Sequence, residues 1–491
     1  MKHRHAPESG CCCCRREFLQ TVGVAVGSMS VLATAGAAVA GDAADESNRS
    51  APARKKQAAV VRGAFLYPDP ESLKKAGYWS WPGSTFDPVA RQRQYMERIG
   101  VMAEKLGMRI LMEEKPLQDG AAAERFLADV KQNKPDGLLL IPFQKQHWQF
   151  VMQIVEKAEL PTVVLATLGV VLSDHLRQLH RRPGVYSVSG ADDLDAVEYG
   201  MRMIRTARWM KDARLVSIAG TGISESTVPH LGTQVRRIPH SRFVQIYQKM
   251  QATPEVQKLA EAYEKGAKQI VEPTKADILD AAKCYFVLKQ IAREESADAL
   301  MMECLSGLRL PHLHAPPCMG FMSLRDEGFP IGCQADLSAT LTLMLVQQLF
   351  DKPGFQQNAA MNTAKNLYFG SHCTSPSKMH GPSGPAEPYH LRSHAEAGWG
   401  CVPRVLYASG QEVTMAQYLP EKKPRMYVYS GKIVDCPPIP PTGGCRSNLE
   451  MTINEVADVC DVKGMHQIIF YGNHARQLRA FCQMYGIAVE T

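Results

Sequence analysis

The sequence lacks several patterns that would identify a common class of protein at once. After residue 40 no two cysteines stand at C-x-x-C spacing, so neither a zinc site nor a thioredoxin-like redox pair is indicated. No basic helix or aromatic-spaced basic stripe is present, and the formal charge of +7 owes much to lysines and arginines near the N-terminus. This distribution of charge argues against a nucleic-acid-binding protein.

Repeats and nucleotide-binding fingerprints are also missing. Beyond two loosely similar α/β halves no internal repeat is visible. The Gly-rich turn at 220–226 lacks the third glycine of a dinucleotide site and the Gly-Lys-Ser/Thr of a P-loop. A plain connection is therefore favoured there over a phosphate site. At 491 residues, the chain is too long for a single core, and two or three domains are expected.

The first forty residues predict an export signal. Arg15 and Arg16 open the run Arg-Arg-Glu-Phe-Leu-Gln, which resembles a twin-arginine motif, and a Gly- and Ala-rich apolar stretch (22–38) leads to the small residues at 38–40. Gly, Ser and Thr break the stretch too often for a stable membrane span. An exported, periplasmic or extracytoplasmic protein is expected; the alternatives are an N-terminal anchor or a wrongly chosen start. Residues 41–56 predict a polar linker.

Ten cysteines remain once Cys11 to Cys14 are removed with the signal. Several stand in apolar runs, where a buried thiol behaves as a small hydrophobic side chain. The twin-arginine route carries proteins that have already folded in a reducing cytoplasm, so widespread disulfides are not required. Cys436 and Cys445 are the one pair to test for a disulfide.

The hydropathy pattern predicts an α/β protein with two Rossmann-like parallel-sheet domains followed by a mainly β C-terminal domain. Strand-length apolar runs alternate with helix-length amphipathic runs over an N-terminal α/β domain (57–180) and a second α/β domain (181–352). We expect Val185 to Val188 to open the second domain. From 353 to 491 short runs alternate with turn residues, which is typical of a mainly β domain.

Polar residues gather in one stretch of the chain, from Phe329 to Pro376. The motif Gly-Cys-Gln-Ala-Asp (332–336) precedes an expected amphipathic helix from Leu337 to Phe350, and Gly-Ser-His-Cys (370–373) closes the stretch. A polar cluster, a helix-length connector and a lone histidine are the pieces from which a site is assembled after folding.

The order of these and later motifs resembles the L-fucose/L-arabinose isomerase superfamily. The resemblance covers most of the mature chain in layout, and its specific part is a set of C-terminal motifs at 332–336, 353–358, 370–374, 411–414 and 464–467, with a closing helix over 476–482. It implies a sugar substrate, interconversion of an aldose and a ketose, and a homo-oligomer with sites near subunit contacts. Such chemistry needs a Mn²⁺-type cation, two carboxylates that bind it and move protons, and histidines that complete its shell.

Carried over position by position, the resemblance places amides where the family has carboxylates. The first carboxylate falls on Gln334 and the second on Asn358, with Gln357 as the alternative. One metal histidine falls on His372, and the other falls on Gln467. A neutral amide carries no charge and accepts no proton near neutral pH, so the family mechanism cannot run here unchanged.

Other groups nearby are candidates for the missing roles. Asp336 and Glu303 are the candidate catalytic residues, Asp336 and His372 the candidate metal ligands, and Gln334, Asn358 and His466 the candidate substrate-binding residues. His394 and Glu396 are also within the same part of the chain. Each has an alternative role: Asp336 as the N-cap of the following helix, Glu303 as an arginine partner, His394 as a surface loop residue.

Two hypotheses follow for the function. The protein is either an exported metal-dependent sugar isomerase with a rearranged site, using Mn²⁺ with Asp336, His372 and Glu303, or an exported carbohydrate-binding protein that keeps the pocket without the catalysis. Export favours the second, because sugar catabolism by the family it resembles takes place inside the cell.

Replacing Arg15 and Arg16 by lysine tests the predicted export route. We expect the precursor to remain in the cytoplasm, because the twin-arginine pair is what the export machinery recognises. Cell fractionation followed by immunoblotting measures this, with Arg4→Lys as a control outside the motif. Normal export of the double variant would show the predicted signal to be wrong.

Overall fold

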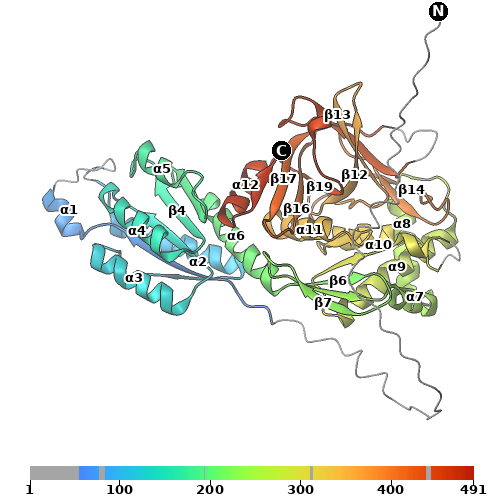
Figure 1. The fold of residues 1–491 in the computed structure, drawn as a ribbon, viewed down its shortest axis with the longest axis horizontal. Coiled ribbons are helices and arrows are strands. Elements are labelled where there is room, and N and C mark those ends of the chain that lie inside the picture. The colour runs from blue at the N-terminus through green and yellow to red at the C-terminus, as the bar shows by residue number, and fades with distance from the viewer. Residues whose placement is uncertain (1–54, 77–82, 84, 193, 310–312, 438–443) are drawn as a thin grey trace, which may run out of the picture. The chain divides into compact units, whose positions relative to one another are not determined.

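The structure is a computed structural model that describes residues 55–76, 83, 85–192, 194–309, 313–437 and 444–491. The predicted export signal lies outside these residues, as does the linker apart from its last two positions. None of the helices in the described ranges has the length and apolar character needed to cross a membrane. The chain is a mixed α/β protein with an antiparallel C-terminal β region, in agreement with the general fold class expected (Figure 1).

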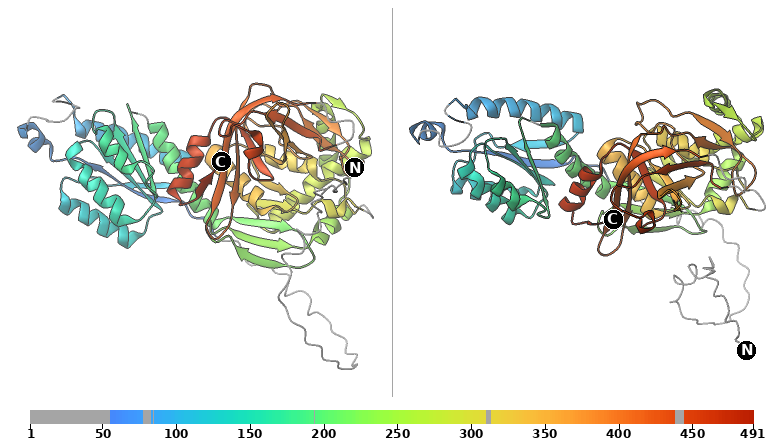
Figure 2. Two further views of the ribbon diagram at one scale, coloured as in Figure 1. Left: turned by 45° about the horizontal axis from the view of Figure 1, so that its top comes forward. Right: turned by 90° about the horizontal axis from the view of Figure 1, so that it is seen from above.

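The first sheet has five parallel strands in the order β2-β1-β3-β4-β5. In chain order they are β1 (Val60–Leu66), β2 (Arg109–Met112), β3 (Gly137–Pro142), β4 (Thr162–Thr167) and β5 (Val185–Gly190). Helices cover both faces (Figure 2): α2 (Pro88–Leu106) and α6 (Leu194–Asp212) pack on one, and α3 (Gly120–Asn133), α4 (Trp148–Ala158) and α5 (Ser173–Leu179) on the other. All six residues of β3 are buried, which explains its continuous apolar sequence.

Strand β5 differs from the sequence prediction. The sequence predicted that this segment opens the second domain, whereas β5 pairs with β4 from Thr162↔Val185 to Thr167↔Gly190. The first sheet therefore continues past residue 180, and α6 connects it to the second sheet. Hydropathy identifies a buried strand but does not identify its neighbour in a sheet.

The second sheet has the order β11-β10-β6-β8-β7, and only its edge strand β7 runs antiparallel to its neighbour. Its strands are β6 (Arg214–Ile218), β7 (Ser224–Thr227), β8 (Gln234–Ile238), β10 (Ala299–Met302) and β11 (Ile331–Cys333). One face packs against α7 (His240–Lys249), α9 (Lys275–Glu294) and α10 (Cys318–Asp326), while α8 (Pro254–Gly266) packs beside α9 and α10. Strand β8 lies on one side of β6 in the sheet, and β10, which comes later in the chain, lies on the other side. The switch point therefore lies between β6 and β10, and in open α/β sheets ligands bind outside the carboxyl ends of strands at such a point.

The C-terminal region is built on a closed ring of six antiparallel strands, which we call the barrel. They are β12 (Phe355–Asn362), β13 (Leu367–His372), β16 (Glu412–Leu419), β17 (Arg425–Asp435), β18 (Ser447–Met451) and β19 (Gln467–Tyr471). The ring closes because β16 pairs with both β17 and β19. Strand β20 (Ala488–Glu490) extends it beside β17, and α12 (Ala475–Met484) packs outside. A small sheet joins β9 (Gln269–Ile270), β14 (Tyr389–Arg392) and β15 (Val402–Val405).

Helix α11 (Leu337–Phe350) departs from the amphipathic helix that the sequence predicted. Its side chains are buried on all sides from Ala339 to Val346. It shares one core with Met301 of the second sheet and with Ile468 and Phe470 of the barrel, and Figure 1 shows it lying under β16 and β19. A helix that is apolar all round is a buried one, and here the second sheet and the barrel cover it from two directions.

A buried amide joins the barrel to the second sheet. Gln356 on β12 is fully buried; its Oε1 accepts a hydrogen bond from the Cys333 backbone N at 2.8 Å and its Nε2 donates to the Cys333 O at 3.1 Å. This side chain therefore pairs with β11 much as a neighbouring strand would. Arg325 donates to the same Oε1 at 3.3 Å and to the Ile331 carbonyl at 2.6 Å. Burial lowers the pKa of Arg325 to about 10, so it stays charged at neutral pH.

Replacing Gln356 by alanine should lower the free energy of unfolding by about 1 to 3 kcal/mol. The change leaves the buried N–H of Cys333 without its partner, whereas the Cys333 O still accepts a hydrogen bond from the Asp336 N at 3.2 Å. Urea unfolding measures the loss. Gln257→Ala, on the exposed face of α8, is the matched control and should stay within about 0.5 kcal/mol of the unmodified protein. Equal stability of the two variants would contradict the role given to Gln356.

Candidate functional site

The candidate site lies at the carboxyl ends of β10 and β11, where Gln356 joins strand β12 of the barrel to β11. Glu303 directly follows β10, and Gln334 directly follows β11. The Ala335 backbone N donates to the Met302 O at 2.9 Å, so the two strand ends stay in register beyond the sheet. Gln356 brings β12, and with it Asn358, to the same edge.

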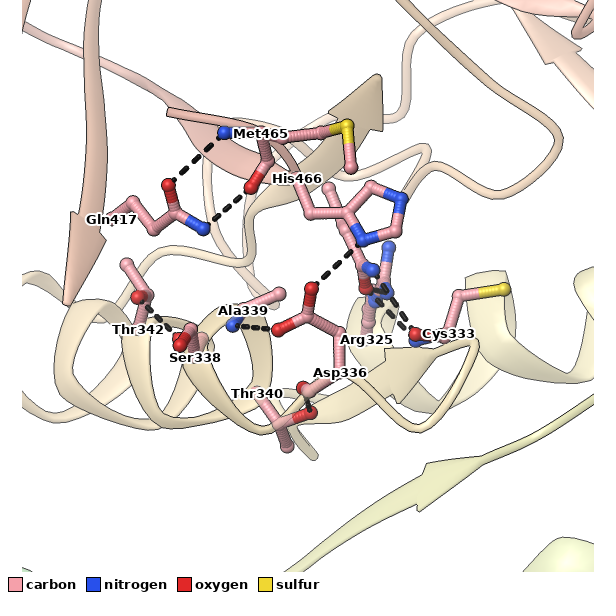
Figure 3. A network of polar contacts seen from close by, with 11 residues as sticks. Arg325, Cys333, Asp336, Ser338, Ala339, Thr340, Thr342, Gln417, Met465 and His466 are labelled. Atoms are coloured by element: carbon pink, nitrogen blue, oxygen red, sulfur yellow. Dashed lines mark hydrogen bonds and ion pairs between the residues drawn. The ribbon is translucent and has the colours of Figure 1, made fainter. Parts of the chain in front are cut away.

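Asp336 uses both of its carboxylate oxygens in contacts within the protein. Oδ1 accepts a hydrogen bond from the Ala339 N at 2.8 Å, which caps the N-terminus of α11. Oδ2 lies 2.8 Å from Nδ1 of His466 (Figure 3). The N-cap that the sequence gave as the alternative role is thus present, and the same carboxylate also orients His466.

Three residues without glycine's freedom adopt left-handed backbone conformations at this edge. Gln334, Ala335 and His466 have φ values of 56°, 50° and 61°. Each such conformation costs on the order of 1–3 kcal/mol and persists only when surrounding contacts hold it, often at functional sites. Gln417 supplies one such contact, since its amide accepts from the Met465 N at 3.2 Å and donates to the Met465 O (Figure 3).

His372 is buried, neutral and short of one hydrogen bond. It is 3% exposed, and its ring centre lies 5.7 Å from that of His466. Burial lowers its pKa to about 3. Nδ1 accepts from the Cys373 N at 3.0 Å, which assigns the proton of the neutral ring to Nε2. Within the described ranges Nε2 has no partner, so a buried N–H donor is left unused.

The other predicted site residues have side-chain polar groups that can still form hydrogen bonds or ion pairs. Gln334 is half-buried, and its side-chain amide makes no hydrogen bond to any described residue. Asn358 is half-buried, and its Nδ2 lies 4.0 Å from the Cys445 Sγ. Glu303 is exposed and forms no ion pair in the described part of the chain, so the expected arginine partner is not seen. Its carboxylate faces His240, where it opposes the lowering of the His240 pKa by burial.

Sequence reasoning missed a row of polar side chains on the barrel. Asn358, Ser371 and Asn448 stand directly opposite one another across β12, β13 and β18. Directly opposite residues point to the same face of a sheet, so these three side chains form one polar strip. Oδ1 of Asn448 is buried and has no partner among the described residues. Only the strand register links Asn448 to the site, and local sequence carries no signal for it.

Five cysteines converge beside the site, although spacing indicated no pair. This thiol cluster comprises Cys304, Cys318, Cys333, Cys373 and Cys445. All ten described cysteines are free thiols. Cys436 and Cys445, the pair that the sequence offered for testing, are not linked: Cys436 accepts a hydrogen bond from the Tyr407 N at 3.2 Å, and Cys445 donates a hydrogen bond to Cys373.

The expected Mn²⁺ ion stays a prediction, and few of the groups at this edge are free to bind it. No group of three or more His, Cys, Asp or Glu side chains in the described ranges is arranged to hold a metal. Both oxygens of Asp336 are engaged, the Nδ1 lone pair of His372 is taken by a backbone N–H, and Gln334 and Asn358 are neutral. Mn²⁺ prefers carboxylate oxygens, which supply the charge that amides lack.

Replacing His372 by glutamine should flatten the dependence of stability on pH. The unfolded histidine titrates near 6.5 and the folded one near pH 3, so between these values the unfolded chain binds the extra proton and stability falls as the pH falls. At pH 5 this loss amounts to about 2 kcal/mol. Denaturant unfolding at pH 7 and pH 5 should show a loss smaller by that amount in His372→Gln. The exposed His180→Gln is the control, and an equal loss in both variants would contradict the assignment.

Comparison with known proteins does not show which family the chain belongs to. No protein-family model and no curated protein matches the chain. One solved structure that it resembles is that of a sugar ABC transporter from Yersinia enterocolitica subsp. enterocolitica 8081, which is 12% identical, with 61% of this chain and 82% of that chain covered. The TM-score of 0.18 is too low to indicate a shared fold. The isomerase resemblance therefore stays a prediction.

Proposed function

We propose that this protein binds a sugar or a closely similar polyol at the carboxyl edge of its second sheet, without a metal ion and without interconverting aldose and ketose. The observation that carries the proposal is the state of the ionisable groups there. Asp336 has both oxygens engaged, and His372 is neutral with its free N–H unpaired. Such an edge offers several hydrogen-bonding groups, and the ring nitrogen left to act as a base is Nε2 of His466, whose Nδ1 is held by Asp336.

Isomerisation needs both a base and an electrophile, and His466, oriented by Asp336, offers only the first. Moving a proton between two carbons of a sugar needs a base within reach of the substrate, and stabilising the resulting charge needs a cation or a comparable electrophile. Amides at Gln334 and Asn358 accept no proton near neutral pH. Glu303 is a carboxylate, but it is exposed to water and faces His240 across the edge rather than a second carboxylate.

A sugar matches the hydrogen-bonding groups that remain. Each sugar hydroxyl both donates and accepts, and the amides of Gln334 and Asn358 do the same. His372 adds a buried donor, and Asn448 adds a buried acceptor. A buried polar group without a partner costs about 1–3 kcal/mol, so pairing these groups with hydroxyls would favour binding. An analogue that lacks one hydroxyl would leave a group unpaired and bind less well.

The position of these residues also supports a binding site. They stand at the carboxyl ends of parallel strands next to the switch point of the second sheet. The strained backbone at Gln334 and His466 fixes the direction of side chains that would meet the ligand. Binding outside the cytoplasm is consistent with the predicted export signal, and a homo-oligomer is expected from the isomerase resemblance.

Ligand-dependent stabilisation tests the proposal. A panel of aldoses and ketoses, added after treatment with EDTA, should include a sugar that raises the melting temperature, because a ligand that binds only the folded state stabilises it by about 2.7 kcal/mol at 100 times its Kd. Titration calorimetry with that sugar should give a Kd at least tenfold weaker in Gln334→Ala and in Asn358→Ala. Gln257→Ala, outside the site, is the matched control and should bind unchanged.

Two results would overturn the proposal. One is formation of ketose from an aldose that requires Mn²⁺ and disappears in Asp336→Asn. The other is a complete panel of sugars that leaves the melting temperature unchanged. A sugar that binds equally well to Gln334→Ala and Asn358→Ala would show that the site lies elsewhere on the protein.

A further inference from the structure

Two thiols of the thiol cluster are in direct contact at the end of the second sheet. Cys333 is the last residue of β11, and Cys304 follows the neighbouring parallel strand β10. Their Sγ atoms are 3.3 Å apart, and each residue is 2% exposed. A disulfide bond is about 2.05 Å long, so the two sulfurs need to approach by only about 1 Å to bond.

We propose that Cys304 and Cys333 form a reversible disulfide when hydrogen peroxide oxidises the protein. The reaction balances as two thiols and one peroxide giving one disulfide and two waters. Cys304 attacks one peroxide oxygen as a thiolate; the O–O bond breaks, the departing hydroxide takes up a proton to become water, and Cys304 becomes a sulfenic acid. Cys333 then attacks the Cys304 sulfur, the S–O bond breaks, and the hydroxyl leaves as the second water with the Cys333 proton.

The contacts around the pair assign the two roles. The hydrogen bond between the two sulfurs can run either way, but only Cys304 also accepts one from the backbone N of Gln334; the contact with Cys333 and this backbone bond lower the pKa of Cys304. The same contact with Cys304, together with burial, raises the pKa of Cys333. Cys304 is therefore the thiol that attacks the oxidant, and Cys333 keeps its proton until the second step.

Because Cys304 and Cys333 are both buried, only a small oxidant can reach their sulfur atoms. A disulfide reagent such as oxidised glutathione needs an open path to the sulfur, which residues 2% exposed do not provide. Hydrogen peroxide has only two heavy atoms and needs little room.

Thiols outside the thiol cluster have raised pKa values and are therefore less reactive than Cys304. Burial raises the pKa of Cys482 to about 12 and also raises that of Cys401. The carboxylate of Asp458 raises the pKa of the exposed Cys460.

A second contact in the thiol cluster, between Cys373 and Cys445, is the competing pair. Cys373 accepts hydrogen bonds from Cys445 and from His394. Cys373 follows β13 and Cys445 precedes β18, so these two also stand beside paired strand ends. We assign the disulfide to Cys304 and Cys333 because their Sγ atoms lie 3.3 Å apart and both residues are buried, whereas Cys445 is only half-buried.

Peptide mapping of the oxidised protein tests the assignment. The reduced, full-length mature protein is treated with hydrogen peroxide, quenched with catalase, denatured in iodoacetamide and digested for mass spectrometry. We expect a linked peptide pair joining Cys304 to Cys333, which dithiothreitol abolishes. Cys482→Ser, which removes a buried thiol outside the thiol cluster, should form the same link.

A trapping experiment gives an independent readout. In Cys333→Ser the second step is blocked, so dimedone present while the peroxide-treated protein is denatured should label the sulfenic acid of Cys304, whereas the unmodified protein should show little label there. Recovery of both Cys304 and Cys333 as alkylated thiols after peroxide treatment would overturn the proposal. So would a disulfide between Cys373 and Cys445 that leaves the other two reduced. Neither readout depends on the binding of a sugar.

Discussion

The pairing of the Gln356 amide with the backbone of Cys333 is the contact on which the candidate site depends. It joins a barrel strand to the edge of the second sheet through two hydrogen bonds of 2.8 and 3.1 Å, in a place from which water is excluded. Gln334 is the next residue after Cys333, and Asn358 lies two residues after Gln356. The two segments that carry the amides of the site are thus held together by a third amide, whose donor and acceptor are both in use.

Few ionised side chains at the candidate site are free to take part in catalysis. Asp336 divides its carboxylate between the cap of α11 and His466, and burial keeps His372 neutral far below physiological pH. Arg325 is charged, but its contacts are with the Ile331 carbonyl and Gln356. Asp336 and Arg325 therefore hold segments in place, and the amides and imidazole nitrogens remain for the ligand proposed above.

The sequence predicts those features that are local. The alternation of strand-length and helix-length apolar runs, and the Gly-Cys-Gln-Ala-Asp motif before α11, each carry their signal within a few residues. The partner of β5, the burial of α11 on every side and the polar row that includes Asn448 depend on register between distant segments. The contact of Asp336 with His466 spans 130 residues, and the isomerase resemblance, rather than local pattern, brought both into the predicted site.

The two thiols and Gln334, one of the residues proposed to bind a ligand, share one piece of backbone, which couples their geometry. Glu303 is bonded to Cys304, and Gln334 is bonded to Cys333, so a change in the distance between the two sulfurs moves both neighbours. Gln334 and Ala335 already occupy left-handed conformations that only their surroundings maintain. Closing the sulfurs by about 1 Å alters those surroundings directly. Oxidation and ligand binding would then act on the same strained strand end, and each would shift the equilibrium of the other.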